Sequence, residues 1–133
     1  MTLDQQRARF AWGKAKERME HQKAYATVAK SAPAFIMANG LMQALAFYQS
    51  RKNDEAKQLT ADIAEWLQRR MLPTTTGEFE SVMNGLYRMP STQYMTATRE
   101  ALAMLRWLRL FTDALKAGSP EVDNASREGV ARA

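Results

Sequence analysis

The stretch PAFIMANGLMQALAFY, residues 33–48, decides the fold of this 133-residue chain. At its centre lies Asn39-Gly40, a pair that normally marks a hairpin turn when apolar runs flank it. The apolar residues nevertheless recur at helical rather than alternating spacing across the pair: Ala34, Ala38, Leu41, Leu45 and Tyr48. We therefore predict one continuous helix through this stretch. Because it is apolar on nearly every side, it must be buried on every side.

Gly40 is the unusual residue of this helix, because glycine in a helix interior costs about 1 kcal/mol relative to alanine. Two interpretations stand side by side. Gly40 either lets another backbone approach closely, or marks a kink that the helix tolerates. We expect the first, with another helix of the bundle crossing close to Gly40.

The rest of the chain also predicts helices, since alternating β-branched runs are missing. A capping box, Thr2-Leu3-Asp4-Gln5, starts a first helix over about residues 2–30, and Pro33 opens the next. Further helices are expected over residues 54–72, 78–86 and 92–117. The predicted fold class is all-α: a single compact bundle of about five or six helices over residues 1–118. Residues 119–133 lack apolar periodicity and are expected to form a flexible, disordered tail.

The inward faces of these helices follow from their apolar spacing. Ala8, Trp12, Ala15 and Met19 mark the inner face of the first helix. Leu59, Ile63, Trp66 and Leu67 mark that of the helix over residues 54–72, which leaves Asp62 and Glu65 on a solvated face. Tyr94, Thr98, Ala101, Leu105, Leu108, Thr112 and Leu115 mark the last helix.

Composition excludes several classes of site. The chain has no cysteine, which rules out disulfides, thiolate metal sites and cysteine nucleophiles. The first residues have no apolar core typical of a signal peptide, and no segment reaches the roughly 18 apolar residues needed to span a membrane. We expect a cytoplasmic protein that does not enter a membrane.

A catalytic site is not expected. His21 is the only histidine, with Glu17 one helical turn before it and Glu20 beside it. Such a pair could bind a metal or act as a base, but a di-metal bundle repeats its Glu-x-x-His motif on two helices and this chain does not. Glycine patterns for phosphate or dinucleotide binding are also missing. The sequence predicts neither catalytic residues nor a metal or cofactor.

Charge is concentrated at the start of the chain. Residues 1–30 hold seven basic and three acidic side chains, a net charge of +4, whereas the other 103 residues hold twelve and eleven, a net charge of +1. A basic helix on a nearly neutral body indicates a polyanion or an acidic protein surface as its partner.

The basic residues form regular lines, which suggests nucleic-acid binding. Those spaced by seven predict a ridge about 30 Å long on the first helix: Arg9, Lys16, Lys23 and Lys30. Arg7, Lys14 and Arg18 form a neighbouring line, and the last helix adds Arg99, Arg106 and Arg109. Such a surface would follow phosphates without reading bases. The alternative is an ordinary solvated helix face.

Three segments, 23–25, 33–47 and 94–111, hold a set of motifs in a fixed order: Lys23-Ala24-Tyr25; Pro33; Ala38-Asn39-Gly40-Leu41-Met42-Gln43-Ala44-Leu45-Ala46-Phe47; and Tyr94, Thr98, Glu100-Ala101-Leu102 and Leu105-Arg106-Trp107-Leu108-Arg109-Leu110-Phe111. In these motifs the chain resembles the small α-helical subunit of the type III-B CRISPR effector complex, also called the Cmr complex or RAMP module. It covers about residues 20–117. The first twenty residues, the loop over residues 74–77 and the tail add little to it.

The resemblance implies a non-catalytic helical bundle that works in antiviral defence. Several copies would stack as the minor filament of the ribonucleoprotein, beside backbone subunits that hold the guide RNA and cut the target RNA. The small subunits would then line the channel in which guide and target pair, and would contact the backbone and large subunits. The family has no catalytic motif to transfer, so the assignment of the basic residues to RNA rests on charge placement. The rival interpretation is a helical adaptor whose basic first helix binds an acidic protein.

Overall fold

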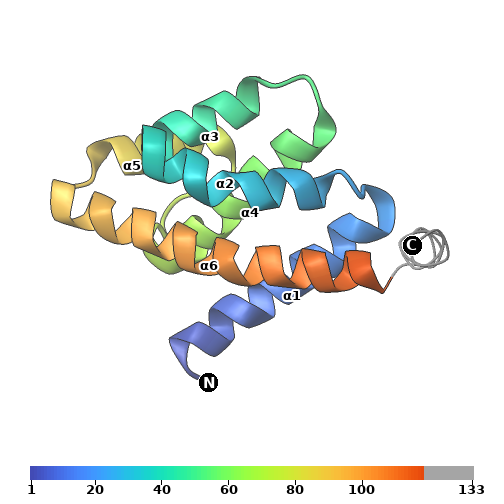
Figure 1. The fold of residues 1–133 in the computed structure, drawn as a ribbon. Coiled ribbons are helices and arrows are strands. Elements are labelled where there is room, and N and C mark those ends of the chain that lie inside the picture. The colour runs from blue at the N-terminus through green and yellow to red at the C-terminus, as the bar shows by residue number, and fades with distance from the viewer. Residues whose placement is uncertain (119–133) are drawn as a thin grey trace, which may run out of the picture.

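The computed structural model describes residues 1–118, which form six α-helices and no strand (Figure 1). The helices are α1 (Leu3–His21), α2 (Tyr25–Asn39), α3 (Leu41–Ser50), α4 (Asp54–Met71), α5 (Phe79–Arg88) and α6 (Ser91–Ala117). The predicted all-α class is therefore confirmed over this range. The predicted tail, residues 119–133, lies outside the described residues.

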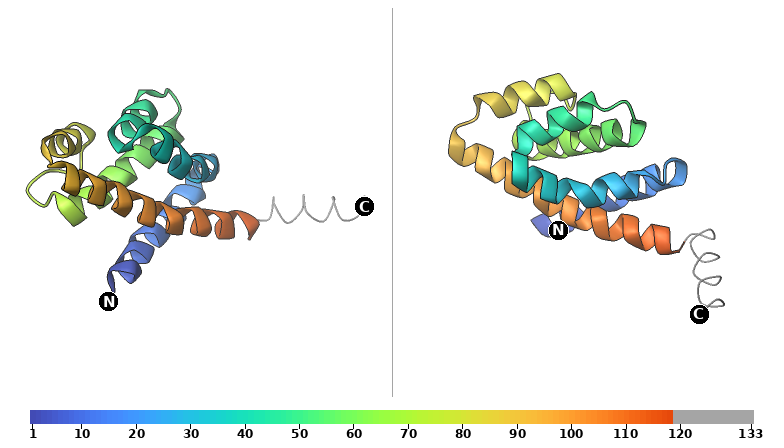
Figure 2. Two further views of the ribbon diagram at one scale, coloured as in Figure 1. Left: turned by 60° about the vertical axis from the view of Figure 1, so that its left-hand side comes forward. Right: turned by 45° about the horizontal axis from the view of Figure 1, so that its top comes forward.

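The long helix α6 organises the arrangement. It packs against α1, α2 and α4, while α4 also packs against α2, α3 and α5. Figures 1 and 2 show α1 crossing beside α6, with its N-terminal end directed away from α2 and α3. Buried apolar side chains from all six helices form one cluster. The predicted core residues of α4, namely Leu59, Ile63, Trp66 and Leu67, all belong to this cluster.

The first helix begins as predicted but ends early. The Thr2 hydroxyl accepts a hydrogen bond from the amide of Gln5, whose side chain accepts one from the amide of Thr2. The helix stops at His21, however, and α2 starts at Tyr25 with Pro33 in its interior. The expected helix over residues 2–30 and the expected start at Pro33 are both wrong. The buried face of α2 continues past Pro33 to Ile36, and this continuous burial outweighs the one backbone hydrogen bond that proline removes.

Gly40 separates two helices instead of lying within one. Its φ of +87° and ψ of 157° belong to a region that essentially only glycine adopts. A Cβ at Gly40 would meet only the Tyr94 hydroxyl, at 3.9 Å, so the expected close approach of another helix backbone is wrong. Tyr94 instead accepts a hydrogen bond from the amide of Met42 at 3.0 Å and satisfies a free donor in the first turn of α3.

The break at Gly40 also changes which residues are buried. In α3 the predicted residues Leu41, Leu45 and Tyr48 are buried. In α2 the predicted Ala34 and Ala38 are exposed, and Met37 is 75% exposed. The expectation of a rod buried on all sides is therefore wrong, because the two halves of the apolar stretch run in different directions and each has its own solvent face.

A substitution at Gly40 tests this role of the positive φ. We expect Gly40→Ala to lower the free energy of unfolding by about 1–3 kcal/mol, the usual cost of an L-residue held in this region. Gly13→Ala is the matched control. A Cβ at Gly13, inside α1, has no neighbour within 4 Å, and alanine there is expected to raise stability by about 0.5–1 kcal/mol. Urea unfolding followed by circular dichroism measures both, and equal effects of the two substitutions would contradict the prediction.

Candidate nucleic-acid interface

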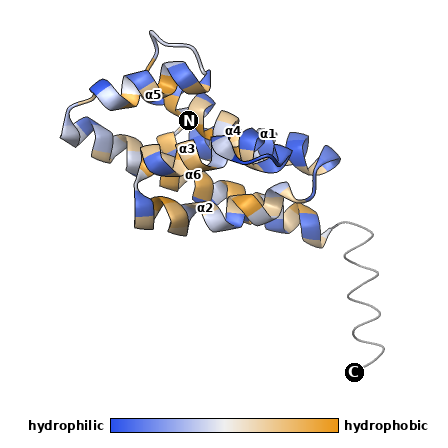
Figure 3. Cartoon of the chain, turned by 90° about the horizontal axis from the view of Figure 1, so that it is seen from above, coloured by the Kyte–Doolittle hydropathy of each residue, from blue (hydrophilic) through white to orange (hydrophobic). Residues whose placement is uncertain are grey.

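Helix α1 is the most hydrophilic helix of the fold, as the colouring in Figure 3 shows. Its basic side chains separate into two lines with different surroundings. Arg7, Lys14 and Arg18 face the rest of the protein, and their side chains are only 17–21% exposed. Arg9 and Lys16 are exposed. The helix therefore holds an inner line that is paired within the fold and an outer line that faces solvent.

The first pairing joins α1 to α4 through a buried carboxylate. Arg18 donates from Nε and Nη2 to the two oxygens of Asp62, at 3.0 and 2.7 Å. Tyr25 donates its hydroxyl to Asp62 Oδ2 at 2.7 Å. Asp62 is 1% exposed, so its predicted place on a solvated face is wrong. The hydrogen bond with Asp62 raises the pKa of Arg18, and burial raises the pKa of Tyr25 well above its usual value.

The second pairing joins α1 to α6. Arg7 donates from Nε and Nη2 to the two oxygens of Glu100, at 2.7 and 2.9 Å. The indole of Trp66 donates to Glu100 Oε1 at 3.1 Å, and Arg70 lies 3.9 Å from the same oxygen. Burial acts to raise the pKa of Glu100, but the hydrogen bond and charge of Arg7 outweigh it and lower this pKa. Sequence reasoning missed the pair, although an acidic residue beside the apolar stripe of α6 was a signal for it.

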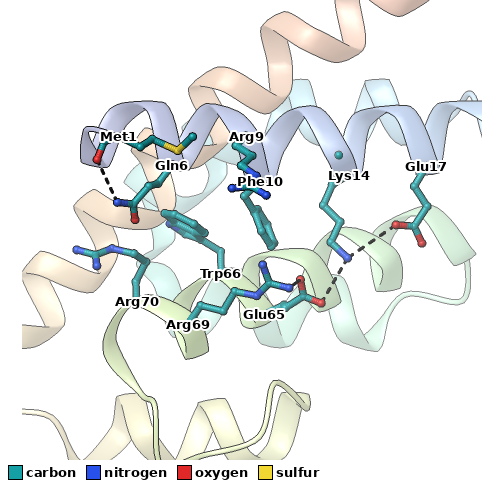
Figure 4. Close-up of a pocket in the computed structure, with 11 residues that line it drawn as sticks. Met1, Gln6, Arg9, Phe10, Lys14, Glu17, Glu65, Trp66, Arg69 and Arg70 are labelled. Carbon is teal, nitrogen blue, oxygen red and sulfur yellow. Dashed lines mark hydrogen bonds and ion pairs between the residues drawn. The ribbon is translucent and has the colours of Figure 1, made fainter.

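A groove lies between α1 and α4, with a volume of about 850 Å³ (Figure 4). Its lining residues are Met1, Gln6, Arg9, Phe10, Gly13, Lys14, Glu17, Glu65, Trp66, Arg69 and Arg70. The rings of Phe10 and Trp66, which are largely buried, lie 5.1 Å apart and supply apolar surface between the two walls. Four basic and two acidic side chains line the groove, so the net charge of its side chains is +2.

The charged groups of the groove are only partly paired. Lys14 Nζ lies 3.4 Å from Glu65 Oε1 and 3.9 Å from Glu17 Oε2. Arg69 Nη2 lies 3.1 Å from the other oxygen of Glu65. Arg9 has no carboxylate partner among residues 1–118. The groove thus combines a free arginine, Arg9, with Arg69, whose exposed ion pair is weak and screened by salt. Lys14 and Arg70 also lie 3.6 and 3.9 Å from the buried carboxylates of Asp62 and Glu100.

At Gly13 the wall of the groove has no side chain. This residue lies in the middle of α1, where glycine costs about 1 kcal/mol relative to alanine, and its surroundings would accept a larger side chain. Nothing in residues 1–118 needs a glycine here. Its absent side chain leaves the helix backbone accessible from the groove, which suits the close approach of another molecule.

The structure gathers some of the predicted nucleic-acid residues and separates others. Arg9 and Lys14 line the groove, whereas Arg18 is held by Asp62. Lys16 lies over the ring of Trp12 at 5.2 Å, outside the groove. Because α1 ends at His21, Lys23 lies in the turn and Lys30 lies on α2. The predicted ridge of basic residues along one helix is therefore wrong. Three further residues, Arg99, Arg106 and Arg109, are exposed on α6 but do not line the groove.

Sequence reasoning missed the contribution of α4 to this groove. Arg69 and Arg70 lie in its last turn, where basic side chains also complement the helix dipole. The sequence does show a basic pair, Arg69-Arg70, one helical turn after Glu65 and Trp66. That signal could not be used from the sequence alone, because nothing there indicates that α1 lies opposite this end of α4.

His21, the other site considered from the sequence, has one acidic residue beside it. The His21 side chain is exposed, with Glu20 at 3.9 Å. Among residues 1–118, no group of three or more histidine or acidic side chains could hold a metal ion. Within the same residues, no helix is both long enough and apolar enough to cross a membrane.

Comparison with known proteins gives consistent results. A model of the Cas_Cmr5 family of CRISPR-associated proteins matches residues 3–115. The CRISPR system Cmr subunit Cmr5 of Thermus thermophilus is 31% identical over 116 residues, which cover 86% of this chain and 96% of that protein. The X-ray crystal structure of a CRISPR-associated Cmr5 family protein from the same organism superposes with a TM-score of 0.74 at 28% sequence identity, covering 86% of this chain and 97% of that one.

Proposed function

Because the chain belongs to the Cmr5 family of CRISPR-associated proteins, we propose that it is the small subunit of a type III-B Cmr effector complex and that it contacts RNA without catalysing a reaction. Its partners are then the other subunits of the complex, neighbouring copies of itself, and the guide and target RNA. In RNA-guided complexes base pairing reads the sequence, while protein supplies basic surfaces matched to the shape of the nucleic acid.

We place the RNA contact in the groove between α1 and α4. The observation that carries this proposal is that two helices distant in the sequence bring Arg9, Lys14, Arg69 and Arg70 to one groove. Arginine binds phosphate through two parallel hydrogen bonds, and such contacts position the backbone without reading bases. The open space at Gly13 supports a backbone lying close to α1.

The predicted basic residues outside the groove would contribute to RNA binding in other ways. Exposed side chains elsewhere on the surface would add phosphate contacts in the assembled complex: Lys16, Lys23, Lys30, Arg99, Arg106 and Arg109. Arg18 would act indirectly, because its guanidinium is already held by Asp62 and positions α1.

The Arg9→Gln/Arg69→Gln double variant tests the proposal, since it removes one cation from each wall of the groove. In the assembled complex we expect weaker binding of single-stranded RNA and a salt dependence whose slope falls by about 1.4 for each subunit that contacts the RNA, or 0.7 for each lost phosphate contact. The matched control, Lys52→Gln/Lys57→Gln, removes two exposed charges that do not line the groove. Binding is measured by fluorescence anisotropy over a range of salt concentrations.

A Gly13→Leu variant addresses the same groove without changing its charge. Leucine is a good helix former and its Cβ would meet nothing within 4 Å at this position, so we expect the fold to keep or gain stability. We expect RNA binding to weaken because the side chain fills the groove. If neither variant changes the affinity or the salt slope, the groove does not hold RNA, and the alternative of an acidic protein partner for α1 is favoured.

A further inference from the structure

Glu65 occupies a particular position in the groove. Its two carboxylate oxygens face different walls: Oε1 lies 3.4 Å from Lys14 of α1, and Oε2 lies 3.1 Å from Arg69 of α4 (Figure 4). The side chain is 32% exposed and therefore reachable from solvent. A phosphate entering the groove would present its own anionic oxygens to the same two cations. Carboxylate and phosphate cannot both occupy that place.

The other acidic residues that face α1 are more deeply buried and more tightly paired than Glu65. Asp62 and Glu100 are buried, and each binds an arginine through both oxygens. Their role in holding α1 is clear. Glu65 makes two partly exposed ion pairs, an arrangement that contributes little to stability. Lys14 would also keep a partner without it, because Asp62 Oδ1 lies 3.6 Å from its Nζ.

We propose that Glu65 is an internal competitor for RNA phosphate, which lowers the affinity of each subunit for RNA. This inference rests on the proposed RNA contact in the groove. The carboxylate holds Lys14 and Arg69 in place while the groove is empty and must be displaced from them when a phosphate binds. A single subunit then binds unrelated RNA poorly, whereas several aligned copies bind one strand firmly, because each further contact is made at high effective concentration.

Glu65→Gln tests the inference, since the amide keeps the size of the side chain and removes its charge. The variant raises the net charge of the side chains that line the groove from +2 to +3. We expect the complex assembled with it to bind single-stranded RNA that lacks complementarity to the guide about three- to fivefold more tightly per subunit. That range corresponds to the upper half of what one exposed ion pair contributes. The salt slope should steepen at the same time, because the freed Arg69 neutralises a phosphate.

The matched control is Glu55→Gln, which removes one carboxylate from the first turn of the same helix, outside the groove. If Glu65→Gln binds RNA no more tightly than Glu55→Gln, the inference is wrong. It is equally wrong if Glu65→Gln binds more weakly, because Glu65 would then be arranging the cations for RNA. The Arg9→Gln/Arg69→Gln variant separates the two proposals: lost affinity there, without a gain from Glu65→Gln, overturns only the competitor role.

Discussion

The Asp62→Ala variant is expected to lose about 3–5 kcal/mol of unfolding free energy, the usual effect of removing one partner from a buried ion pair. The substitution leaves the guanidinium of Arg18 and the hydroxyl of Tyr25 without the acceptor that now binds both. Because domains are stable by only about 5–15 kcal/mol, such a loss is a large part of the total. Urea unfolding at neutral pH measures it.

Two further variants make this result interpretable. Asp113→Ala removes an exposed carboxylate from α6 and should change stability by no more than about 0.5 kcal/mol. The triple variant Arg18→Met/Asp62→Leu/Tyr25→Phe replaces Asp62 and its two hydrogen-bond donors with apolar side chains, while Lys14 keeps Glu65 and Glu17 as partners, and it should recover most of the loss. A loss below about 1 kcal/mol for Asp62→Ala would show that the pair does not hold α1 to α4.

The Glu100→Gln variant should lose about 3 kcal/mol at pH 7 and should also lose a pH dependence that the natural chain has. Arg7 lowers the pKa of Glu100 below the usual 4.5 in the folded chain, so the unfolded chain binds the proton more readily. The stability that this carboxylate contributes is complete above pH 4.5 and is lost as the pH falls through its folded pKa. The difference between the natural chain and the variant should therefore shrink on acidification.

Urea unfolding at several pH values between 7 and 3 measures this difference. Glu80→Gln is the control, since Glu80 is exposed on α5 and pairs with nothing among residues 1–118. Its unfolding curve should stay parallel to that of the natural chain at every pH. A constant difference between the natural chain and Glu100→Gln over the whole range would contradict the assigned role of Glu100.

Local patterns predicted the parts of the fold that local physics decides. The capping box at Thr2 and the core face of α4 follow from spacing within one helix, and they are confirmed. The predicted stripe of α6 is confirmed at Ala101, Leu105, Leu108 and Thr112, whereas its other three members, Tyr94, Thr98 and Leu115, are only partly buried. The resemblance to the Cmr small subunit also led to the correct family. These features need no knowledge of what lies across from each helix.

What failed depends on contacts between helices. On α1 the predicted Ala15 and Met19 are buried, but the unpredicted Phe10 and Ala11 are buried as well and the predicted Trp12 is exposed. The helix is rotated so that Arg7 and Arg18 reach their carboxylates, and periodicity of apolar residues does not contain that information. The break at Gly40 could not be predicted from apolar spacing either, because the helical spacing of apolar residues continues across it. The groove itself required knowing that the end of α4 lies opposite α1.

The position of Met1 has a practical consequence for preparing this protein. Met1 lines the same groove as Arg69 and Arg70, and its carbonyl accepts a hydrogen bond from the Gln6 side chain at 3.5 Å. An affinity tag fused ahead of Met1 would emerge directly into this groove, and a polyhistidine or acidic linker there would alter any measured RNA affinity. Binding measurements should therefore use protein purified through a carboxyl-terminal tag, or protein from which an amino-terminal tag has been completely cleaved.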